Sequence, residues 1–402
     1  MTTTARRADP QRIRACLQPA AEAVRAGVIP SAVVAVADSA GTIALEMFPG
    51  PSTRRLRRDS IFFLASLTKP VVATGVMRLV DGGLVDLHAP IERYVPAFQG
   101  PAKERVTAWH VLTHTAGIQD VHPDVLRQQR PSGARLLEMI CQAPLRFEPG
   151  SRYEYCSASF YLLAELLVRF TGRPFPQALH QTVMGPAGMV DTSFDPRHGR
   201  SRILPVEGVP MRNRLVQELV LRYLAKTALP GGGLWGTAED LARFGRGLLP
   251  TAIAHGRGLL SAASLEEMTR EQTDGILEIS DDGARRDPRY ALGWGKPRSD
   301  GLAPSVVGGL APALDGSAMD LAGVPGGPGA SHTNGQVDPA AGASPTVPAS
   351  SRAFTHGGAT GTRLWVDPDR DLVFVFLTNL WGASDAAMFE SLAGIYGVLD
   401  EA

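Results

Sequence analysis

The sequence Ser66-Leu67-Thr68-Lys69 lies at the junction of two apolar runs, one at 61–64 and one at 71–80. The first run has the length and composition of a buried strand. The second is typical of a buried helix, which the glycines at 82 and 83 would end. If this helix begins near Ser66, one helical turn places the Ser66 hydroxyl beside the Lys69 amine. The junction therefore predicts a strand, a nucleophile and a helix in succession.

Lysine is rare in this chain, which gives Lys69 added weight. It occurs only at positions 69, 103, 226 and 296, so the other 36 of the 40 basic residues are arginines. Arginine stays protonated near neutral pH, whereas a buried lysine can lose its proton and act as a base. A Ser-x-x-Lys pattern also arises by chance, so the rest of the sequence must distinguish a catalytic pair from an accident.

Composition indicates an ordinary globular protein without a strong net electrostatic field. The 402 residues are 44% hydrophobic and 20% charged, with a formal net charge of zero. This length allows two or three domains with a large core. A neutral chain does not favour nucleic acid or an anionic membrane, so neither partner is expected. The local basic cluster at 54–58 is interpreted as a solvated loop, with docking of an anionic substrate or carrier as the alternative.

Cysteine usage and the absence of long apolar stretches indicate a cytoplasmic protein. The three cysteines, Cys16, Cys141 and Cys156, form no Cys-x-x-Cys pair, which argues against a disulfide framework. The first residues contain no apolar stretch of the kind that a secretory signal needs. His110 and His114 have the spacing of a zinc pair, but Val111 stands where a zinc-protease motif needs Glu. No metal and no cofactor are expected.

The order of the elements predicts an α+β protein assembled from its two ends. One helix is expected from Asp9 to Gly27. The expected strands are 32–37, 42–48, 290–294, 362–366 and 372–377, and the other helices are 107–113, 134–141, 159–170, 215–224, 237–249 and 384–399. Strands at both ends, with helices between them, predict a sheet domain of residues 10–75 and 231–402 and a helical domain of residues 76–230. Residues 298–352, rich in Gly, Ala, Pro and Ser, are expected to form a mobile insertion.

Four further segments join the Ser-x-x-Lys pattern in a characteristic order. They are Leu112-Thr-His-Thr-Ala-Gly117, Tyr155-Cys156-Ser157, the glycine run 231–233 with Thr237 and Asp240, and His356-Gly357-Gly358-Ala359-Thr360-Gly361. In this order they resemble the serine β-lactamase superfamily, namely class C β-lactamases, D-alanyl-D-alanine carboxypeptidases and family VIII carboxylesterases. The resemblance covers about residues 10–395 apart from the insertion.

The resemblance implies a fold and a set of site residues. The fold is an antiparallel sheet flanked by helices, with an inserted all-helical domain. Ser66 matches the nucleophile, and Lys69 and Tyr155 match the residues that activate it. Either of the two can take the proton, and the sequence leaves this open. The backbone N–H groups implied as the oxyanion hole are those of Ser66 and Ala359. The residues implied to support or bind the substrate are His356, Gly357, Gly358 and Ser157.

Departures from the family's motifs favour an esterase. Ser157 stands where Asn is usual, His356 stands where the lactamases often have Lys, and no Ser-Asp-Asn motif is present. These changes remove an amide donor and a fixed cation that a carboxylated β-lactam would use. We therefore expect a serine hydrolase that acts on small or medium acyl esters through an acyl-enzyme.

Three alternatives remain open at this point. One is an acyltransferase that uses the same acyl-enzyme, another is a weak β-lactamase or D-amino peptidase, and the last is an inactive binding scaffold. In each enzymatic case the expected partner is a small-molecule ester or acyl substrate, and the oligomeric state is left open.

Overall fold

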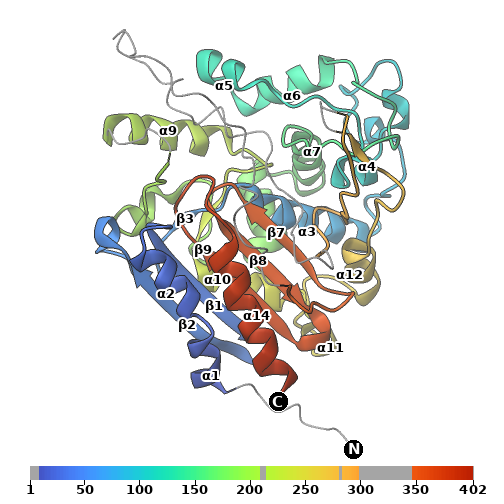
Figure 1. Ribbon diagram of the computed structural model, residues 1–402. Helices are drawn as coiled ribbons and strands as arrows, with labels where there is room; N and C mark the ends of the chain where they lie inside the picture. Colours follow the sequence, from blue (N-terminus) through green and yellow to red (C-terminus); the bar gives the residue numbers. More distant parts are fainter. Residues whose placement is uncertain (1–8, 209–213, 280–282, 298–345, 402) are drawn as a thin grey trace, which may run out of the picture.

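A five-stranded antiparallel sheet forms the centre of the molecule in the computed structural model, which describes residues 9–208, 214–279, 283–297 and 346–401 (Figure 1). Its strand order is β2-β1-β9-β8-β7. The strands are β1 (Ser31–Asp38), β2 (Gly41–Pro49), β7 (Phe354–Gly358), β8 (Thr362–Asp367) and β9 (Leu372–Leu377). Because β1 pairs with β9, the two ends of the chain form one sheet, as the sequence predicts.

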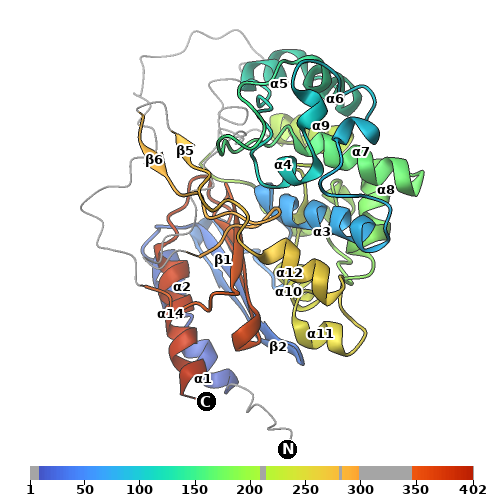
Figure 2. The ribbon, with the colours of Figure 1, turned by 90° about the vertical axis from the view of Figure 1, so that its right-hand side faces the viewer.

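Both faces of the sheet are covered, which explains the continuous apolar runs of its strands. In β1, Val33 and Ala35 belong to one hydrophobic core and Val34 and Val36 to the other, as the two-residue period of a strand requires. Figure 2 shows α1 (Pro10–Ala15), α2 (Gln18–Arg25) and α14 (Ala386–Asp400) on one face. On the other face lie α3 (Thr68–Asp81), α10 (Ala238–Arg246), α11 (Pro250–Ala254) and α12 (Ala262–Thr269).

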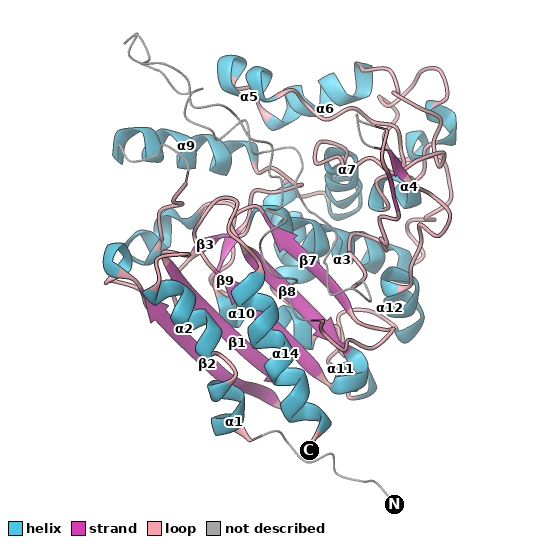
Figure 3. Cartoon of the chain, viewed as in Figure 1, coloured by secondary structure: helices cyan, strands magenta, loops and turns pink. Residues whose placement is uncertain are grey.

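The middle of the chain is helical and lies beyond one end of the sheet (Figure 3). Its helices are α4 (Ala108–Leu112), α5 (Pro123–Gln129), α6 (Gly133–Gln142), α7 (Phe160–Thr171), α8 (Phe175–Leu179) and α9 (Arg214–Thr227). Short two-stranded ladders join β3 (Phe62–Phe63) to β4 (Trp235–Gly236) and β5 (Glu278–Ile279) to β6 (Arg285–Arg286). Within the described ranges, no helix combines the length and the apolar character needed to cross a membrane.

The prediction of a single helix from Asp9 to Gly27 is wrong in one respect. The helix starts at the Asp9 cap as expected, but it breaks between α1 and α2. Pro19 explains the break, because its ring lacks the N–H that would bond to the Ala15 carbonyl and would clash with that carbonyl in a continuous helix. The predicted apolar face survives the break, since Ile13 and Leu17 are both buried.

The predicted strand at 290–294 is also wrong. Tyr290 pairs instead with Gly295 across a tight turn, and the Ala291 N–H donates to the Trp294 carbonyl. Gly293 has a φ of +76° in this turn, a conformation that few other residues adopt. The segment therefore folds back on itself, and only Gly295 reaches β7, where it pairs with Thr355.

Of the predicted mobile insertion, 298–352, the structure describes only the last residues, 346–352. Residues 298–345 lie outside the described residues. For residues 346–352 the prediction is wrong, because Val347 is buried and the Ser350 side chain and N–H both donate to the Asp367 carboxylate of β8. The Lys296 amine also donates to the Ser351 carbonyl, so several contacts pack this end of a Gly/Ala/Pro-rich stretch.

Candidate active site

Ser66 lies in a short 3-10 turn (Ala65–Leu67) that leads directly into α3. The preceding β3 is held by its ladder to β4 and by a bond from the Leu64 N–H to the Leu234 carbonyl. Ala65 has a φ of +46°, in the left-handed region that costs free energy for a residue with a side chain. The chain therefore makes a strained turn immediately before the serine. The predicted order of strand, Ser66 and helix is confirmed, but the turn itself was not predicted.

The Lys69 amine lies at the centre of three acceptors. Its Nζ is 3.2 Å from the Ser66 Oγ, 3.0 Å from the Ser157 Oγ and 2.6 Å from the Gly231 carbonyl oxygen. The carbonyl can only accept, whereas each hydroxyl can donate or accept. A neutral Lys69 can thus donate to Gly231 and direct its lone pair at the Ser66 hydroxyl.

Burial makes the neutral form of Lys69 accessible near neutral pH. The side chain is 0% exposed, and this burial lowers the pKa of Lys69 to about 7, while the Asp120 carboxylate opposes the shift. Its Nζ also lies 4.5 Å from the centre of the Tyr155 ring. Burial of an amine without a contacting carboxylate is a way to poise a lysine as a base.

Tyr155 is half-buried, but its hydroxyl is enclosed by the protein near the same serine. Burial raises the pKa of Tyr155 far above its usual range, and the nearby Ser66 hydroxyl only partly opposes this. Among the described residues, the Tyr155 hydroxyl has no hydrogen-bond partner of good geometry. Its contact with the Ser66 hydroxyl is therefore not a normal hydrogen bond. The phenol is therefore neutral in the free site and has an unused hydrogen to donate.

The turn between β7 and β8 is fastened to the segment that precedes Ser66. The Thr360 hydroxyl donates to the Phe63 carbonyl at 2.7 Å, and the Thr362 hydroxyl donates to the Leu64 carbonyl at 3.2 Å. A Cβ on Gly358 would lie 2.4 Å from the Leu64 oxygen, so this close approach requires glycine. Ala359 follows Gly358 directly, which places its backbone next to the Ser66 segment.

His356 supports the site from within the protein. Its Nδ1 lies 2.8 Å from the Gly357 carbonyl, which can only accept, so Nδ1 carries the hydrogen and Nε2 accepts from the Tyr290 hydroxyl at 3.0 Å. Burial lowers the pKa of His356 to about 3, with Lys69 acting in the same direction. His356 is thus a neutral, internally bonded group and cannot replace the cation of the lactamase motif.

His114, which the sequence presents in a possible zinc pair and in the segment 112–117, holds Tyr155 in place. The His114 carbonyl accepts from the Glu154 N–H, and its Nδ1 accepts from the Cys156 N–H at 3.1 Å, so it binds the residues on both sides of Tyr155. Its ring packs on the Tyr155 ring at 4.3 Å between centres. The part of the chain that the structure describes contains no group of three or more metal-ligating side chains.

Asp120 is a second residue near the site that the sequence did not reveal. Its carboxylate accepts from the backbone N–H groups of Ser157 and Ala158, each at 3.0 Å. It comes from the loop that follows the segment 112–117, and no sequence motif marks it. Only evidence that this loop contacts the Tyr155 segment in the folded protein would have identified Asp120 from the sequence.

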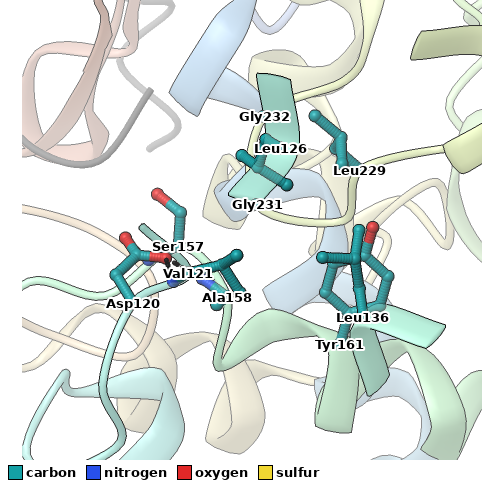
Figure 4. Close-up of a pocket in the computed structure, with 10 residues that line it drawn as sticks. All are labelled: Asp120, Val121, Leu126, Leu136, Ser157, Ala158, Tyr161, Leu229, Gly231 and Gly232. Atoms are coloured by element: carbon teal, nitrogen blue, oxygen red, sulfur yellow. Dashed lines mark hydrogen bonds between the residues drawn. The ribbon is translucent and has the colours of Figure 1, made fainter. Parts of the chain in front are cut away.

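A small pocket adjoins the Lys69 environment (Figure 4). It has a volume of about 30 Å³, and its exposed lining is almost entirely apolar. In Figure 4, Asp120 and Ser157 lie on one side, and Tyr161 and Leu136 lie on the other. The remaining lining residues are Val121, Leu126, Ala158, Leu229, Gly231 and Gly232. Ser157 and Gly231 both contact Lys69, so the pocket lies beside the groups that surround the Lys69 amine.

Known proteins with related sequences include esterases and peptidases. Protein Rv1367c of Mycobacterium tuberculosis is 28% identical over 349 residues, which cover 80% of this chain and 78% of that protein. Esterase EstB of Burkholderia gladioli is 31% identical over 242 residues, 50% of this chain and 62% of EstB. The D-alanyl-D-alanine-carboxypeptidase/endopeptidase AmpH of Escherichia coli K12 is 28% identical over 212 residues, 50% of this chain and 51% of AmpH.

Solved structures share the fold along nearly the whole chain. A family VIII carboxylesterase superposes with a TM-score of 0.70 at 20% identity, covering 97% of each chain. EstCE1, described as a hydrolase with promiscuous acyltransferase activity, superposes with a TM-score of 0.68 at 19% identity, covering 96% of this chain and 99% of its own. The family described as Beta-lactamase matches residues 13–395. The chain therefore belongs to the Beta-lactamase family and has its fold.

Proposed function

We propose that this protein is a carboxylesterase that hydrolyses small or medium acyl esters through an acyl-enzyme on Ser66. The observation that carries the proposal is the Lys69 amine, which is fully buried, 3.2 Å from the Ser66 hydroxyl and close to losing its proton at neutral pH. A serine hydroxyl is a weak nucleophile and needs such a base. The intact arrangement argues against an inactive scaffold.

We assign the role of base to Lys69 and a separate role to Tyr155. Lys69 accepts the Ser66 proton as Oγ attacks the acyl carbon, because its pKa lies near 7 whereas the pKa of Tyr155 is raised. The neutral Tyr155 hydroxyl is placed to give a proton to the alcohol that leaves, and the Lys69 ammonium then returns the proton taken from Ser66 to Tyr155. The N–H groups of Ser66 and Ala359 stabilise the oxyanion. Water then gives a proton to the neutral Lys69 as it attacks the acyl carbon, and that proton passes to the Ser66 Oγ as the acid is released.

The pocket beside Ser157 supports a short acyl chain. The pocket is small, with a volume of about 30 Å³, and two of its lining residues, Ser157 and Gly231, contact Lys69. Its apolar lining offers little to a polar acyl substituent. Ser157, in addition, has its hydroxyl engaged by Lys69. These features favour acetyl to butyryl esters over long chains and over acyl groups that carry an amide.

Replacement of the nucleophile tests the proposal. Ser66→Ala should abolish hydrolysis of p-nitrophenyl acetate and butyrate while the circular dichroism spectrum and melting temperature stay close to those of the wild type. Intact-mass analysis of the wild type after a slow acyl substrate should show one adduct, located on Ser66 by peptide mapping. Unchanged ester turnover in a folded Ser66→Ala variant would contradict the proposal.

Acyl transfer to an alcohol or amine is the second candidate. Two proteins of the same fold suggest it. EstCE1 is described as a hydrolase with promiscuous acyltransferase activity and superposes with a TM-score of 0.68 at 19% identity, and a simvastatin synthase superposes with a TM-score of 0.66 at 18% identity. The same acyl-enzyme would form, and only the acceptor would differ. Alcohols or amines added to the ester assay should leave most acyl groups with water if hydrolysis is the function. Diversion of most acyl groups to the acceptor would favour the transferase.

A further inference from the structure

The Asp120 carboxylate accepts hydrogen bonds from the backbone of the Tyr155 segment and from its own loop. Its Oδ2 accepts from the Ser157 N–H at 3.0 Å, and its Oδ1 accepts from the N–H groups of Ala158 and Val121, also at 3.0 Å (Figure 4). Ser157 and Ala158 lie just before Ser159, the cap residue of α7. One side chain thus joins the loop after α4 to the start of α7.

These bonds connect Asp120 to the candidate base through a single residue. The Ser157 N–H is bound by Asp120, and the Ser157 hydroxyl is one of the three groups around the Lys69 amine. We infer that Asp120 is a positioning residue of the proposed reaction, which fixes Ser157 and supplies the carboxylate that balances the charge of Lys69. The inference rests on the proposed function of the same site.

The electrostatic surroundings of Lys69 make Asp120 its principal source of negative charge. Burial lowers the pKa of Lys69, and the groups that oppose this are Asp120 first and the Cys156 thiol second. Burial raises the pKa of the Cys156 thiol, so this group is neutral near pH 7. The other titratable groups around the amine are the neutral phenol of Tyr155 and the neutral imidazoles of His114 and His356. Removal of the Asp120 charge should therefore make Lys69 lose its proton at lower pH.

Labelling of Ser66 by a fluorophosphonate probe at a series of pH values tests this inference. The probe reports nucleophile activation directly, so its result does not depend on which ester, if any, is the substrate. In the wild type the labelling rate should rise through about pH 7 as Lys69 loses its proton. In Asp120→Asn the rising limb should move to lower pH. A move of about half a pH unit would raise the rate at pH 5.5, relative to its plateau, about threefold.

A charge-conserving variant separates the two roles. Asp120→Glu keeps the carboxylate but displaces it by one methylene, so the limb should stay in place while the plateau rate falls about tenfold or more, as for a misplaced catalytic group. Asp120→Asn should lower the plateau as well, because its amide nitrogen cannot accept from a backbone N–H. A plateau equal to that of the wild type in Asp120→Glu would overturn the positioning role.

Asp240 offers a matched control. Its buried carboxylate also accepts from two successive backbone N–H groups, those of Val190 and Asp191. Asp240→Asn makes the same chemical change away from Lys69, so it should lower the melting temperature without moving the limb. The inference about charge is overturned if the limb of folded Asp120→Asn coincides with that of the wild type. It is equally overturned if Asp240→Asn moves the limb to the same extent.

Discussion

The Lys69 Nζ lies 3.2 Å from the Ser66 Oγ, and neither residue is more than 4% exposed. The 3-10 turn that contains Ser66 and the start of α3 bring this pair together, and the surrounding protein excludes the water that would otherwise keep the amine charged. The pair therefore has the geometry that the proposed nucleophile and base require.

Replacement of the candidate base should remove most of the activity. Lys69→Ala should lower kcat on the order of 10²-fold or more, the usual scale for loss of a general base. Lys69→Arg should be no better, because a guanidinium does not lose its proton near neutral pH. Lys103→Arg is the control. Lys103 is another buried lysine, and its amine donates to the Cys141 carbonyl. Its replacement tests whether arginine in place of a buried lysine simply unfolds the protein. Ester turnover retained in Lys69→Arg would assign the base elsewhere.

The rate should depend on pH in a definite direction. The pKa of Lys69 is lowered to about 7, and the neutral amine is the active form, so kcat/KM should rise with pH through about 7 and then level off. Below that value the ammonium form cannot accept the Ser66 proton. The measurement is a pH profile with an ester that is stable from pH 5 to 9. A profile that falls as pH rises through 7 would be incompatible with a lysine base.

Tyr155 should act with Lys69 rather than independently. Tyr155→Phe removes only the hydroxyl and should lower kcat on the order of 10²-fold. Combined with Lys69→Ala, it should cost little more than either change alone, because groups that act as a unit are not additive. Tyr223→Phe, which alters a half-buried tyrosine of α9, is the control and should leave kcat unchanged. Fully additive losses in the double variant would indicate that one of the two residues is merely structural.

The fit of Gly358 against the Leu64 carbonyl should matter for rate. Gly358→Ala would place a Cβ 2.4 Å from that oxygen and push the β7–β8 turn away from Ser66. We expect kcat to fall at least tenfold while KM changes less, because a displaced N–H donor weakens the transition state most. Gly397→Ala is the matched control, since it meets no atom within 4 Å and lies in α14. It should leave kcat unchanged and stabilise the helix by up to about 1 kcal/mol.

A β-lactam should be a poor substrate compared with an ester. Ser157 offers no amide to a substrate carbonyl, and the neutral, internally bonded His356 offers no cation to a substrate carboxylate. We therefore expect little or no nitrocefin turnover beside clear turnover of p-nitrophenyl butyrate under the same conditions. Nitrocefin turnover above that of every ester would favour the β-lactamase alternative, and release of D-alanine from a model peptide would favour the peptidase.

Local periodicity allowed most elements to be predicted from the sequence. In β1, polar and apolar residues do not alternate, because both faces of this strand are buried. The strand was predicted instead from its continuous apolar run and the turns that flank it. The cap at Thr237 correctly marks the start of α10, since its side chain accepts from the Asp240 N–H. The helix broken before Pro19 and the turn at Gly293 show where a covalent or backbone constraint overrides an apolar pattern.

The sequence alone determined the spacing of Ser66 and Lys69, because residues three apart on a helix meet through local geometry. Only the tertiary structure decided what surrounds them. Lys69 meets Ser157, 88 residues away, and the Gly231 carbonyl, 162 residues away, while His114 and Asp120 reach the Tyr155 segment from a separate loop. Such contacts depend on how distant segments pack. The order of the motifs implied that Ser157 belongs to the site, but neither a motif nor a period predicted its bond to Lys69 or the part played by Asp120. The protonation state of Lys69 follows from that packing, because burial, rather than residue type, removes the water that would stabilise its charge.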